Sequence, residues 1–215
     1  SETWRFVGGL EGDITDDIRF EASANWGRYK VKSVNNNNVL YDRFLAAIDV
    51  TTDAQGNPVG VLAESWESAP DGLTHVFRLR RGVTWHDGRP FTSADVQFTA
   101  MEMWKKILNY GTTLQQFLTE VQTPDPHTAI FRYERPMPQG LLLRAMPDLG
   151  YISPKHVFET GDIRQNPANT APVGTGPFRF VQYERGQFII AERNPNYWRE
   201  NMPYLDRVVW RVVPD

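Results

Sequence analysis

The chain contains no cysteine among its 215 residues. This absence excludes a disulfide framework, a thiolate-bound metal and a cysteine nucleophile. Long hydrophobic runs are also missing, because stretches such as Leu141-Leu142-Leu143 fall far short of the roughly 20 residues of a membrane span. The first residues, Ser1-Glu2-Thr3, do not resemble a signal peptide. We therefore expect a mature or trimmed amino-terminal end and no transmembrane helix.

Basic charge is scarce as well. The sequence has 23 Lys and Arg against 26 Asp and Glu, which gives a formal net charge of -3. Nucleic-acid binding usually needs a basic face, so this balance argues against it. Hydrophobic residues make up 40% and charged residues 23%, which is typical of globular proteins. The length suffices for one large or two small domains.

The histidines give no metal-site pattern. None has a second histidine or a carboxylate at the spacing that a helix would use to bind a metal; the four are His75, His86, His127 and His156. His86-Asp87 is followed by Gly88, and an Asp-Gly pair is a strong turn signal. We therefore interpret His86 as a turn residue and expect neither a metal nor a cofactor.

The usual catalytic motifs are missing too. No G-x-S-x-G sequence is present. Gly174-Thr175-Gly176 resembles a phosphate loop only in part: it lacks a third glycine and a following lysine, and it precedes a predicted strand instead of a helix. The acidic groups at Asp16-Asp17 and within Glu64–Glu67 are interpreted as solvated surface. We therefore expect no catalytic residue.

Hydrophobic periodicity predicts strands and helices without strict alternation, which is typical of an α+β or mixed α/β fold. Strands are predicted at residues 4–7, 117–122, 128–133, 178–183, 187–193 and 208–213, and two more within 59–80 around a turn at 70–72. Helices are predicted at residues 39–48, 93–108 and 137–146, and a further one opens at 153–156. Residues 53–58 are predicted to form a hairpin turn, and 161–176 a loop.

Turn and cap residues set the limits of these elements. Gly8-Gly9 is predicted to close the first strand, residues 11–17 to be turn-rich, and residues 18–38 to form a surface loop or a helix start. Thr92 is predicted to cap the next helix, with Asp95 three residues later completing a capping box. The last helix is predicted to begin with Ser153 as its cap and Pro154 in its first turn.

Three groups of sequence strings resemble one known family. The first contains Leu62-Ala63-Glu64-Ser65-Trp66-Glu67, Asp71-Gly72-Leu73-Thr74 and Phe77-Arg78-Leu79-Arg80-Arg81-Gly82-Val83. The second contains Trp85-His86-Asp87-Gly88-Arg89-Pro90-Phe91-Thr92 and Asp95-Val96. The third contains Val173-Gly174-Thr175-Gly176-Pro177-Phe178, Arg193-Asn194-Pro195-Asn196-Tyr197-Trp198 and Leu205-Asp206-Arg207-Val208. In this order they closely resemble the peptide/nickel class of solute-binding proteins, bacterial extracellular solute-binding family 5, over residues 39–215.

The resemblance implies a receptor and no enzyme. Family members have two lobes that close on a ligand, and they deliver it to a membrane permease driven by ATPase subunits. It implies a periplasmic-binding-protein-like lobe made of residues 1–43 and 170–215, an inserted family-specific subdomain at 44–169, and a carboxy-terminal lobe that is missing here. It also implies a periplasmic location, or an extracellular one with a membrane tether. The stretch 12–18 departs from the Leu-Asp-Pro signature that members usually carry after the first strand.

The same resemblance points to a ligand-binding segment. Residues Gly174, Thr175 and Gly176 correspond to a family segment that faces the ligand cleft, where glycines let a ligand approach the main chain closely. Tyr110 and Trp26 are further candidates for the cleft. A tight crossover between domains is the alternative interpretation of Gly174–Gly176. A peptide is the expected ligand, whereas nickel is disfavoured because the chain has no histidine cluster.

Two other classes of function stay open on sequence alone. One is a self-contained interaction or oligomerisation module, which would be indicated by a stable homodimer that buries a broad apolar face. The other is an enzyme whose site is spread over loops, which would be indicated by a histidine or carboxylate with a strongly shifted pKa in a cleft.

Overall fold

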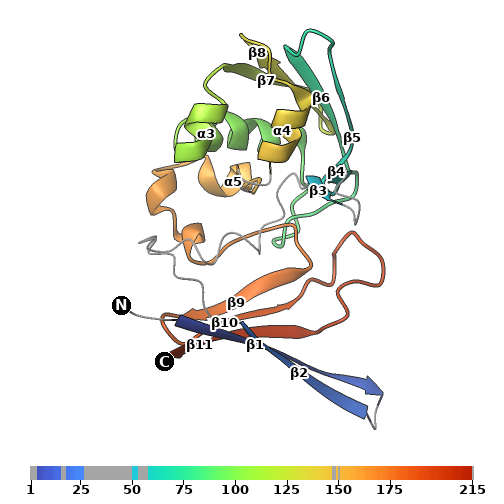
Figure 1. Ribbon diagram of the computed structural model, residues 1–215, viewed down its shortest axis with the longest axis vertical. Coiled ribbons are helices and arrows are strands. Elements are labelled where there is room, and N and C mark those ends of the chain that lie inside the picture. The colour runs from blue at the N-terminus through green and yellow to red at the C-terminus, as the bar shows by residue number, and fades with distance from the viewer. Residues whose placement is uncertain are drawn as a thin grey trace.

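The computed structural model describes residues 4–15, 18–26, 50–52, 58–146, 149 and 151–214, and side-chain burial within 60–211 of these ranges. Its strands form two separate layers with a short hairpin between them (Figure 1). The fold is mixed α/β, as predicted. The predicted helix at residues 39–48 and the predicted boundary at 43/44 lie outside the described residues, so the proposed domain limits stay a prediction.

The first layer is a five-stranded sheet with the strand order β2-β1-β11-β10-β9, and all its neighbouring strands run antiparallel. Its strands are β1 (Trp4–Thr15), β2 (Ile18–Trp26), β9 (Phe178–Glu184), β10 (Phe188–Arg193) and β11 (Arg207–Pro214). The pairing of β1 with β11 places the two ends of the described chain side by side. No sequence periodicity could predict this contact.

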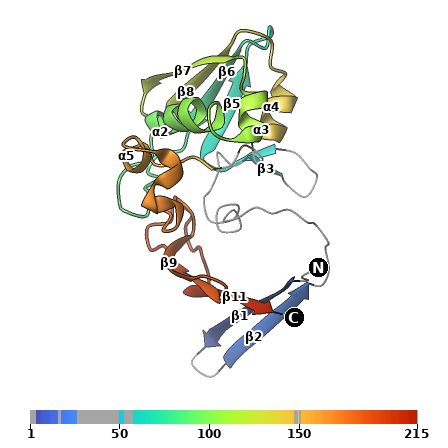
Figure 2. The same ribbon diagram turned by 90° about the vertical axis from the view of Figure 1, so that its left-hand side faces the viewer.

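The second layer, here called the α/β unit, joins a four-stranded antiparallel sheet of order β5-β6-β8-β7 to helices on one of its faces (Figures 1 and 2). The strands are β5 (Ala63–Ser68), β6 (Thr74–Leu79), β7 (Leu118–Asp125) and β8 (Thr128–Tyr133). The helices are α2 (Ser93–Phe98), the π-helix η1 (Thr99–Trp104), α3 (Asn109–Leu114), α4 (Gln139–Ala145) and α5 (Lys155–Phe158). Between the two layers, β3 (Val50–Thr52) and β4 (Pro58–Gly60) pair antiparallel, as the two strands of a hairpin do.

Side chains between the sheet and helices of the α/β unit form its hydrophobic core. Strand β6 alternates in burial, because His75, Phe77 and Leu79 are buried while their neighbours are more exposed. Trp85 and Trp104 are the largest side chains in the core, with exposed fractions of 2% and 1%. Burying a large aromatic ring supplies much of a core's stabilisation, so Trp85 and Trp104 have a structural role in the α/β unit.

The first strand is longer than predicted. Gly8 and Gly9 lie inside β1, paired with residues of β2, and the strand continues through most of the acidic stretch to Thr15. Residues 18–26, expected to be a loop or helix start, form β2. The prediction treated the two glycines as a stop, whereas cross-strand pairing of the backbone overrides their weak strand propensity.

The helix predicted at residues 93–108 is wrong in its second half. The predicted capping box begins it, since the Thr92 amide donates to the Asp95 carboxylate at 2.9 Å. At Thr99, however, regular α-helix gives way to π-helix. The Thr99 hydroxyl donates to the Asp95 carbonyl at 2.8 Å and accepts from the Ser153 amide at 2.9 Å. Such bonds of a threonine to the preceding turn bend helices, and apolar spacing does not reveal them.

The predicted cap of α5 is also wrong. Pro154 occupies the cap position, and the Ser153 amide points to Thr99 instead. The Ser153 residue is completely buried, so packing against the Thr99 turn decides its role. A serine before a proline is a reasonable start signal, but a long-range bond overrides it here.

Candidate functional site

The predicted ligand-binding segment lies where the chain leaves the α/β unit for the five-stranded sheet. After α5 the chain passes through two 3₁₀ turns, Ile163–Gln165 and Pro167–Asn169, and then enters β9 (Figure 2). Gly174, Thr175 and Gly176 lie immediately before β9, and all three are buried. We call Gly174–Gly176 the crossover segment.

His86 binds the crossover segment through both its ring and its backbone. Its imidazole Nδ1 accepts a hydrogen bond from the Gly174 amide at 3.1 Å, and its Nε2 lies 3.0 Å from the Gly176 carbonyl oxygen. Its own backbone amide donates to the Gly174 carbonyl at 2.8 Å. A backbone amide can only donate and a carbonyl can only accept. The ring is therefore neutral and carries its hydrogen on Nε2.

The surroundings of His86 favour this neutral form. Burial lowers the pKa of His86 below its ordinary value, and the positive charge of Arg179 acts in the same direction. The bond to the Gly176 carbonyl and the charge of Asp87 oppose the change without cancelling it. A buried imidazolium would lack the solvation that water gives it, which is why burial dominates.

Asn194 binds the crossover segment at Gly176. Its side-chain amide donates to the Gly176 carbonyl at 3.0 Å, and its backbone amide donates to the Pro177 carbonyl at 2.8 Å. The side-chain oxygen accepts from the Asn196 amide at 3.0 Å, so the Asn194–Asn196 turn is fixed as well. The Gly176 carbonyl therefore receives bonds from both His86 and Asn194, and its position is strongly determined.

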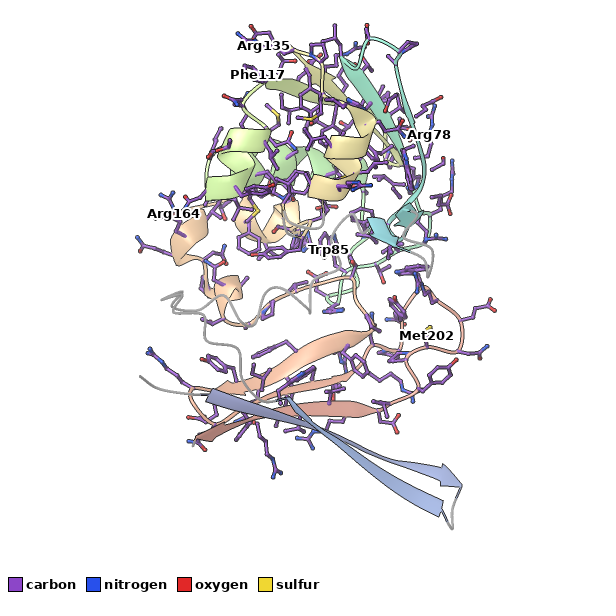
Figure 3. All side chains as sticks on the ribbon, viewed as in Figure 1. Arg78, Trp85, Phe117, Arg135, Arg164 and Met202 are labelled. Carbon is purple, nitrogen blue, oxygen red and sulfur yellow. The ribbon has the colours of Figure 1, made fainter. Side chains whose placement is uncertain are left out.

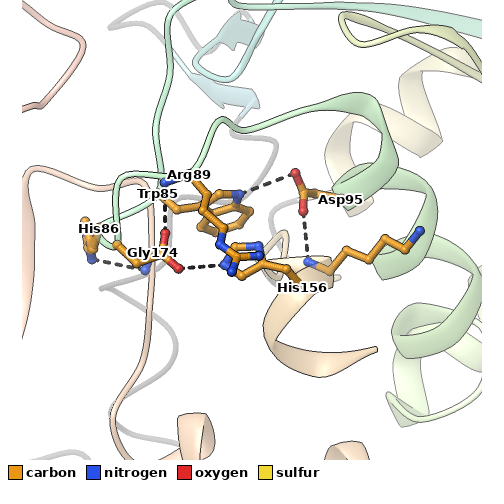
Figure 4. Close-up of polar contacts among 8 residues, drawn as sticks. Trp85, His86, Arg89, Asp95, His156 and Gly174 are labelled. Atoms are coloured by element: carbon orange, nitrogen blue, oxygen red, sulfur yellow. Dashed lines mark hydrogen bonds and ion pairs between the residues drawn. The ribbon is translucent and has the colours of Figure 1, made fainter. Parts of the chain in front are cut away.

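The turn that carries His86 is itself anchored in the α/β unit (Figure 4). Asp87 binds His156 of α5, with 2.6 Å between Oδ2 and Nε2. Burial alone would raise the pKa of Asp87, but the hydrogen bonds from His156 and the Arg89 amide outweigh it and hold that pKa below its ordinary value. Gly88 has a φ of 86°, a conformation that favours glycine.

Trp85 fixes the start of the same turn. Its indole nitrogen lies 3.4 Å from an oxygen of Asp95, and its ring packs edge-on against Phe91. Figure 3 shows Trp85 at the end of the α/β unit that faces the five-stranded sheet. His86 is therefore presented to the crossover segment by a rigid support.

The structure brings together only part of the predicted site. Tyr110 lies in α3 with 55% of its surface exposed, and within the described chain no hydrogen bond joins it to the crossover segment. Trp26 ends β2, where its backbone pairs with Phe6, but its side chain lies outside the described residues. For these residues and for the crossover segment, a ligand contact stays a prediction.

The described residues also form two surface grooves, and the larger one is lined in part by Asn194. One, of about 640 Å³, follows the loop 193–204 that contains Met202 (Figure 3), and the other, of about 380 Å³, lies beside α2 and β7. Neither is lined by the crossover segment or by Tyr110. Across the described ranges, no group of three or more His, Asp or Glu side chains could hold a metal ion. Within those ranges, none of the helices is both long and apolar enough to cross a membrane.

His86 and Asn194 are the residues that sequence reasoning missed. Both stand inside strings that carry the family resemblance, and His86 was interpreted as a turn residue. Their partners lie 88 and 18 residues away in the sequence. Periodicity and turn signals act over a few residues, so they contain no information on such bonds.

Comparison with known proteins gives the family. The profile described as bacterial extracellular solute-binding proteins, family 5 Middle, matches residues 57–215. The oligopeptide-binding protein AppA of Bacillus subtilis is 31% identical over 188 residues, which are 85% of this chain and 33% of AppA. The glutathione-binding protein GsiB of Pectobacterium atrosepticum is 31% identical over 160 residues, 73% of this chain and 30% of GsiB. The chain thus spans about a third of the length of the curated relatives it matches.

Solved structures agree with the sequence match. AppA of Bacillus subtilis in complex with a nonapeptide has a TM-score of 0.70 and 30% identity, covering 81% of this chain and 35% of AppA. NikZ of Campylobacter jejuni in complex with Ni(L-His) has a TM-score of 0.69 and 26% identity, covering 78% of this chain and 33% of NikZ. The chain belongs to family 5 of the bacterial extracellular solute-binding proteins.

Proposed function

We propose that this chain is the amino-terminal part of a solute-binding receptor of an ABC importer, and that the receptor binds a peptide or a related small solute between two lobes. The observation that carries this proposal is the family match over residues 57–215, which includes every sequence string of the predicted resemblance. The proposal includes a membrane permease as partner, a periplasmic location and the absence of enzymatic activity.

A peptide is the ligand class that the relatives favour. AppA is an oligopeptide-binding protein with a nonapeptide in its solved complex, and GsiB binds glutathione, itself a short peptide. A nickel chelate, as in NikZ, has less support, because the described residues offer no cluster of metal-binding side chains. We propose that the second lobe corresponds to the part of the relatives' sequences that this chain does not span.

Within the chain, Thr175 is the side chain best placed to meet a ligand at the crossover segment. It is 1% exposed, and its hydroxyl has no hydrogen-bond partner among the described residues. A buried hydroxyl without a partner costs stability, so such groups are retained where a ligand or water completes them.

A thermal-shift screen tests the receptor assignment. The 215-residue chain is heated with a pool of peptides, with glutathione, with Ni(L-His) and with oligosaccharides. Peptides should raise the melting temperature more than the other ligands. A ligand at about 100-fold above its Kd stabilises the fold by about 2.7 kcal/mol. Mass spectrometry of the recovered peptides should show them intact. Cleaved peptides would contradict the assignment, and stabilisation by oligosaccharides or Ni(L-His) alone would overturn the peptide class. Stabilisation by no ligand class would mean that binding needs the second lobe.

A pair of valine variants tests the ligand contact. Thr175→Val keeps the side-chain shape and removes a hydroxyl without a described partner, so the unliganded melting temperature should hold or rise. The stabilisation by peptides should fall. Thr119→Val is the matched control, because Thr119 is exposed on β7 and its hydroxyl only contacts the Arg132 carbonyl. An undiminished peptide effect in Thr175→Val would place the ligand contact elsewhere.

A further inference from the structure

We propose that His86 is a positioning residue for the crossover segment: its neutral imidazole, with hydrogen on Nε2, fixes the backbone of Gly174 and Gly176, and protonation of the ring releases the Gly174 side. The inference deepens the proposed function, on which its ligand-binding part rests. The clamp itself concerns only this chain and can be tested without a ligand.

The geometry permits one protonation state. Three hydrogen bonds join His86 to the crossover segment, and two of them use the ring nitrogens in opposite roles. The Gly174 amide needs an acceptor at Nδ1, and the Gly176 carbonyl needs a donor at Nε2. In an imidazolium both nitrogens donate, so the Gly174 amide and Nδ1–H would face each other as two donors. The bond at Gly174 would then be lost.

The charged groups around His86 influence the pH at which its ring becomes charged. Arg179 of β9 and Asp87 of the same turn are the charged residues that act on the ring, in opposite directions. Asp87 is engaged by His156 of α5 and by the Arg89 amide. Its carboxylate is therefore held by donors other than His86, and burial favours the neutral ring near neutral pH. In mild acid the ring can charge only by giving up its bond to Gly174.

The two anchors of the crossover segment respond differently. Asn194 does not titrate, and its bond to the Gly176 carbonyl persists at any pH that leaves the protein folded. Protonated His86 can still donate from Nε2 to that same carbonyl. Only the Gly174 amide loses its partner, so the release is confined to the start of the segment, next to Thr175. The part of the segment proposed to meet the ligand would thus loosen in acid.

The first test measures the ring and the amide directly by NMR on the ¹⁵N-labelled chain. Near pH 7.5 the imidazole shifts should show Nδ1 without hydrogen and Nε2 with it. Hydrogen-exchange protection of the Gly174 amide, normalised to the intrinsic exchange rate, should fall about tenfold as His86 becomes charged, the effect of one lost hydrogen bond. An Nδ1–H tautomer, or Gly174 protection that does not change with the charge of His86, would overturn the clamp.

Two variants separate a clamp from simple packing. His86→Gln offers an acceptor and a donor on one carboxamide and does not titrate, so Gly174 protection should be retained and become independent of pH. His86→Leu fills similar space without polar atoms, and protection should be low at every pH. His127→Gln, in the turn between β7 and β8, is the matched control and should behave as the original chain. If His86→Leu fails to fold, His86→Gln and the ring tautomer still distinguish the clamp from simple packing.

The ligand-binding part is tested by repeating the peptide screen near pH 5.5 and near pH 7.5. Peptide stabilisation should be weaker at the lower pH in the original chain and equal at both in His86→Gln. Equal stabilisation at both pH values in both proteins would overturn the positioning role. If no peptide stabilises either protein, the ligand-binding part of the inference fails for this chain alone, whereas the NMR result on the clamp stands independently.

Discussion

At the scale of single residues, the carboxylate of Asp95 joins three segments of the α/β unit. One oxygen accepts from the Thr92 amide at 2.9 Å and lies 3.4 Å from the Trp85 indole nitrogen. The other accepts from the Lys155 amide at 2.9 Å. Asp95 is 4% exposed, so its carboxylate is largely shielded from water. An ionised carboxylate only accepts, which matches a site where every neighbour donates.

Asp95→Asn should therefore destabilise the fold although it is nearly isosteric. Its NH₂ group would face either the Lys155 amide or the donors at Thr92 and Trp85, and a buried donor would lose its acceptor. The expected loss in free energy of unfolding is about 1–3 kcal/mol, measured by urea denaturation.

Asp71→Asn is the control for Asp95→Asn. Asp71 is exposed and accepts a single bond from the Leu73 amide, a role that an asparagine oxygen performs equally well. The control should stay within about 0.5 kcal/mol of the original protein. Equal losses in the two variants would show that the Asp95 network does not hold these segments together.

Sequence reasoning identified half of this network. The spacing of Thr92 and Asp95 predicted the capping box, because both partners lie within one helical turn. The contacts of Asp95 with Trp85 and Lys155 depend on how distant segments pack. The same limit explains why His86 was interpreted as a turn residue: the turn is real, but the clamp on Gly174 exists only after the chain has folded.

At the scale of elements, the close approach of α3 to the end of η1 depends on Gly111. A Cβ added at Gly111 would lie 2.3 Å from the Trp104 carbonyl oxygen and 2.9 Å from its carbonyl carbon. Both are backbone atoms, so no side-chain rotation relieves the clash. This contact belongs to the region where the predicted single helix breaks into η1 and α3.

Gly111→Ala should lower the free energy of unfolding by about 1–3 kcal/mol, as overpacking of a buried site does. Gly140→Ala is the matched control, because Gly140 also lies in a helix and an added Cβ meets nothing within 4 Å. Alanine should stabilise that position by up to about 1 kcal/mol. Chemical denaturation of both variants gives the comparison, and a neutral Gly111→Ala would show that the two helices can separate freely.

Most element types were predictable and most element ends were not. The turn at Pro70-Asp71-Gly72 and the strands around it are confirmed, since local turn chemistry and alternation determine them. The π-helix at Thr99 and the lost cap at Ser153 share one cause, a mutual bond between two residues that lie 54 apart. The continuation of β1 through Gly8-Gly9 likewise depends on pairing with β2.

At the scale of the whole molecule, two sets of contacts join the α/β unit to the part of the chain that follows it. His86 holds the crossover segment, and the Arg80 guanidinium stacks 4.3 Å from the ring centre of Trp198, which Arg199 approaches at 4.7 Å. Family resemblance, and not periodicity, predicted that the chain's two ends share a lobe. The pairing of β1 with β11 is compatible with that arrangement.

Stability of the whole chain should fall in mild acid because His75, which is buried, and His86, which is partly buried, are held in neutral form. Burial lowers the pKa of His75 and of His86 below the ordinary 6.5, and the Nε2 of His75 has no hydrogen-bond partner among the described residues. Below pH 6.5 the unfolded chain gains protons that the folded chain does not bind. The contribution is therefore complete above 6.5 and is lost as the pH falls toward the folded pKa values.

Urea denaturation at a series of pH values measures this loss. The slope should not exceed about 1.4 kcal/mol per pH unit for each histidine. His86→Gln should reduce the slope between pH 6.5 and the folded pKa of His86 and leave the contribution of His75. A stability that stays constant below pH 6.5 would mean that both rings charge in the folded protein at no cost, which the burial of His75 and the Gly174–Nδ1 bond of His86 oppose.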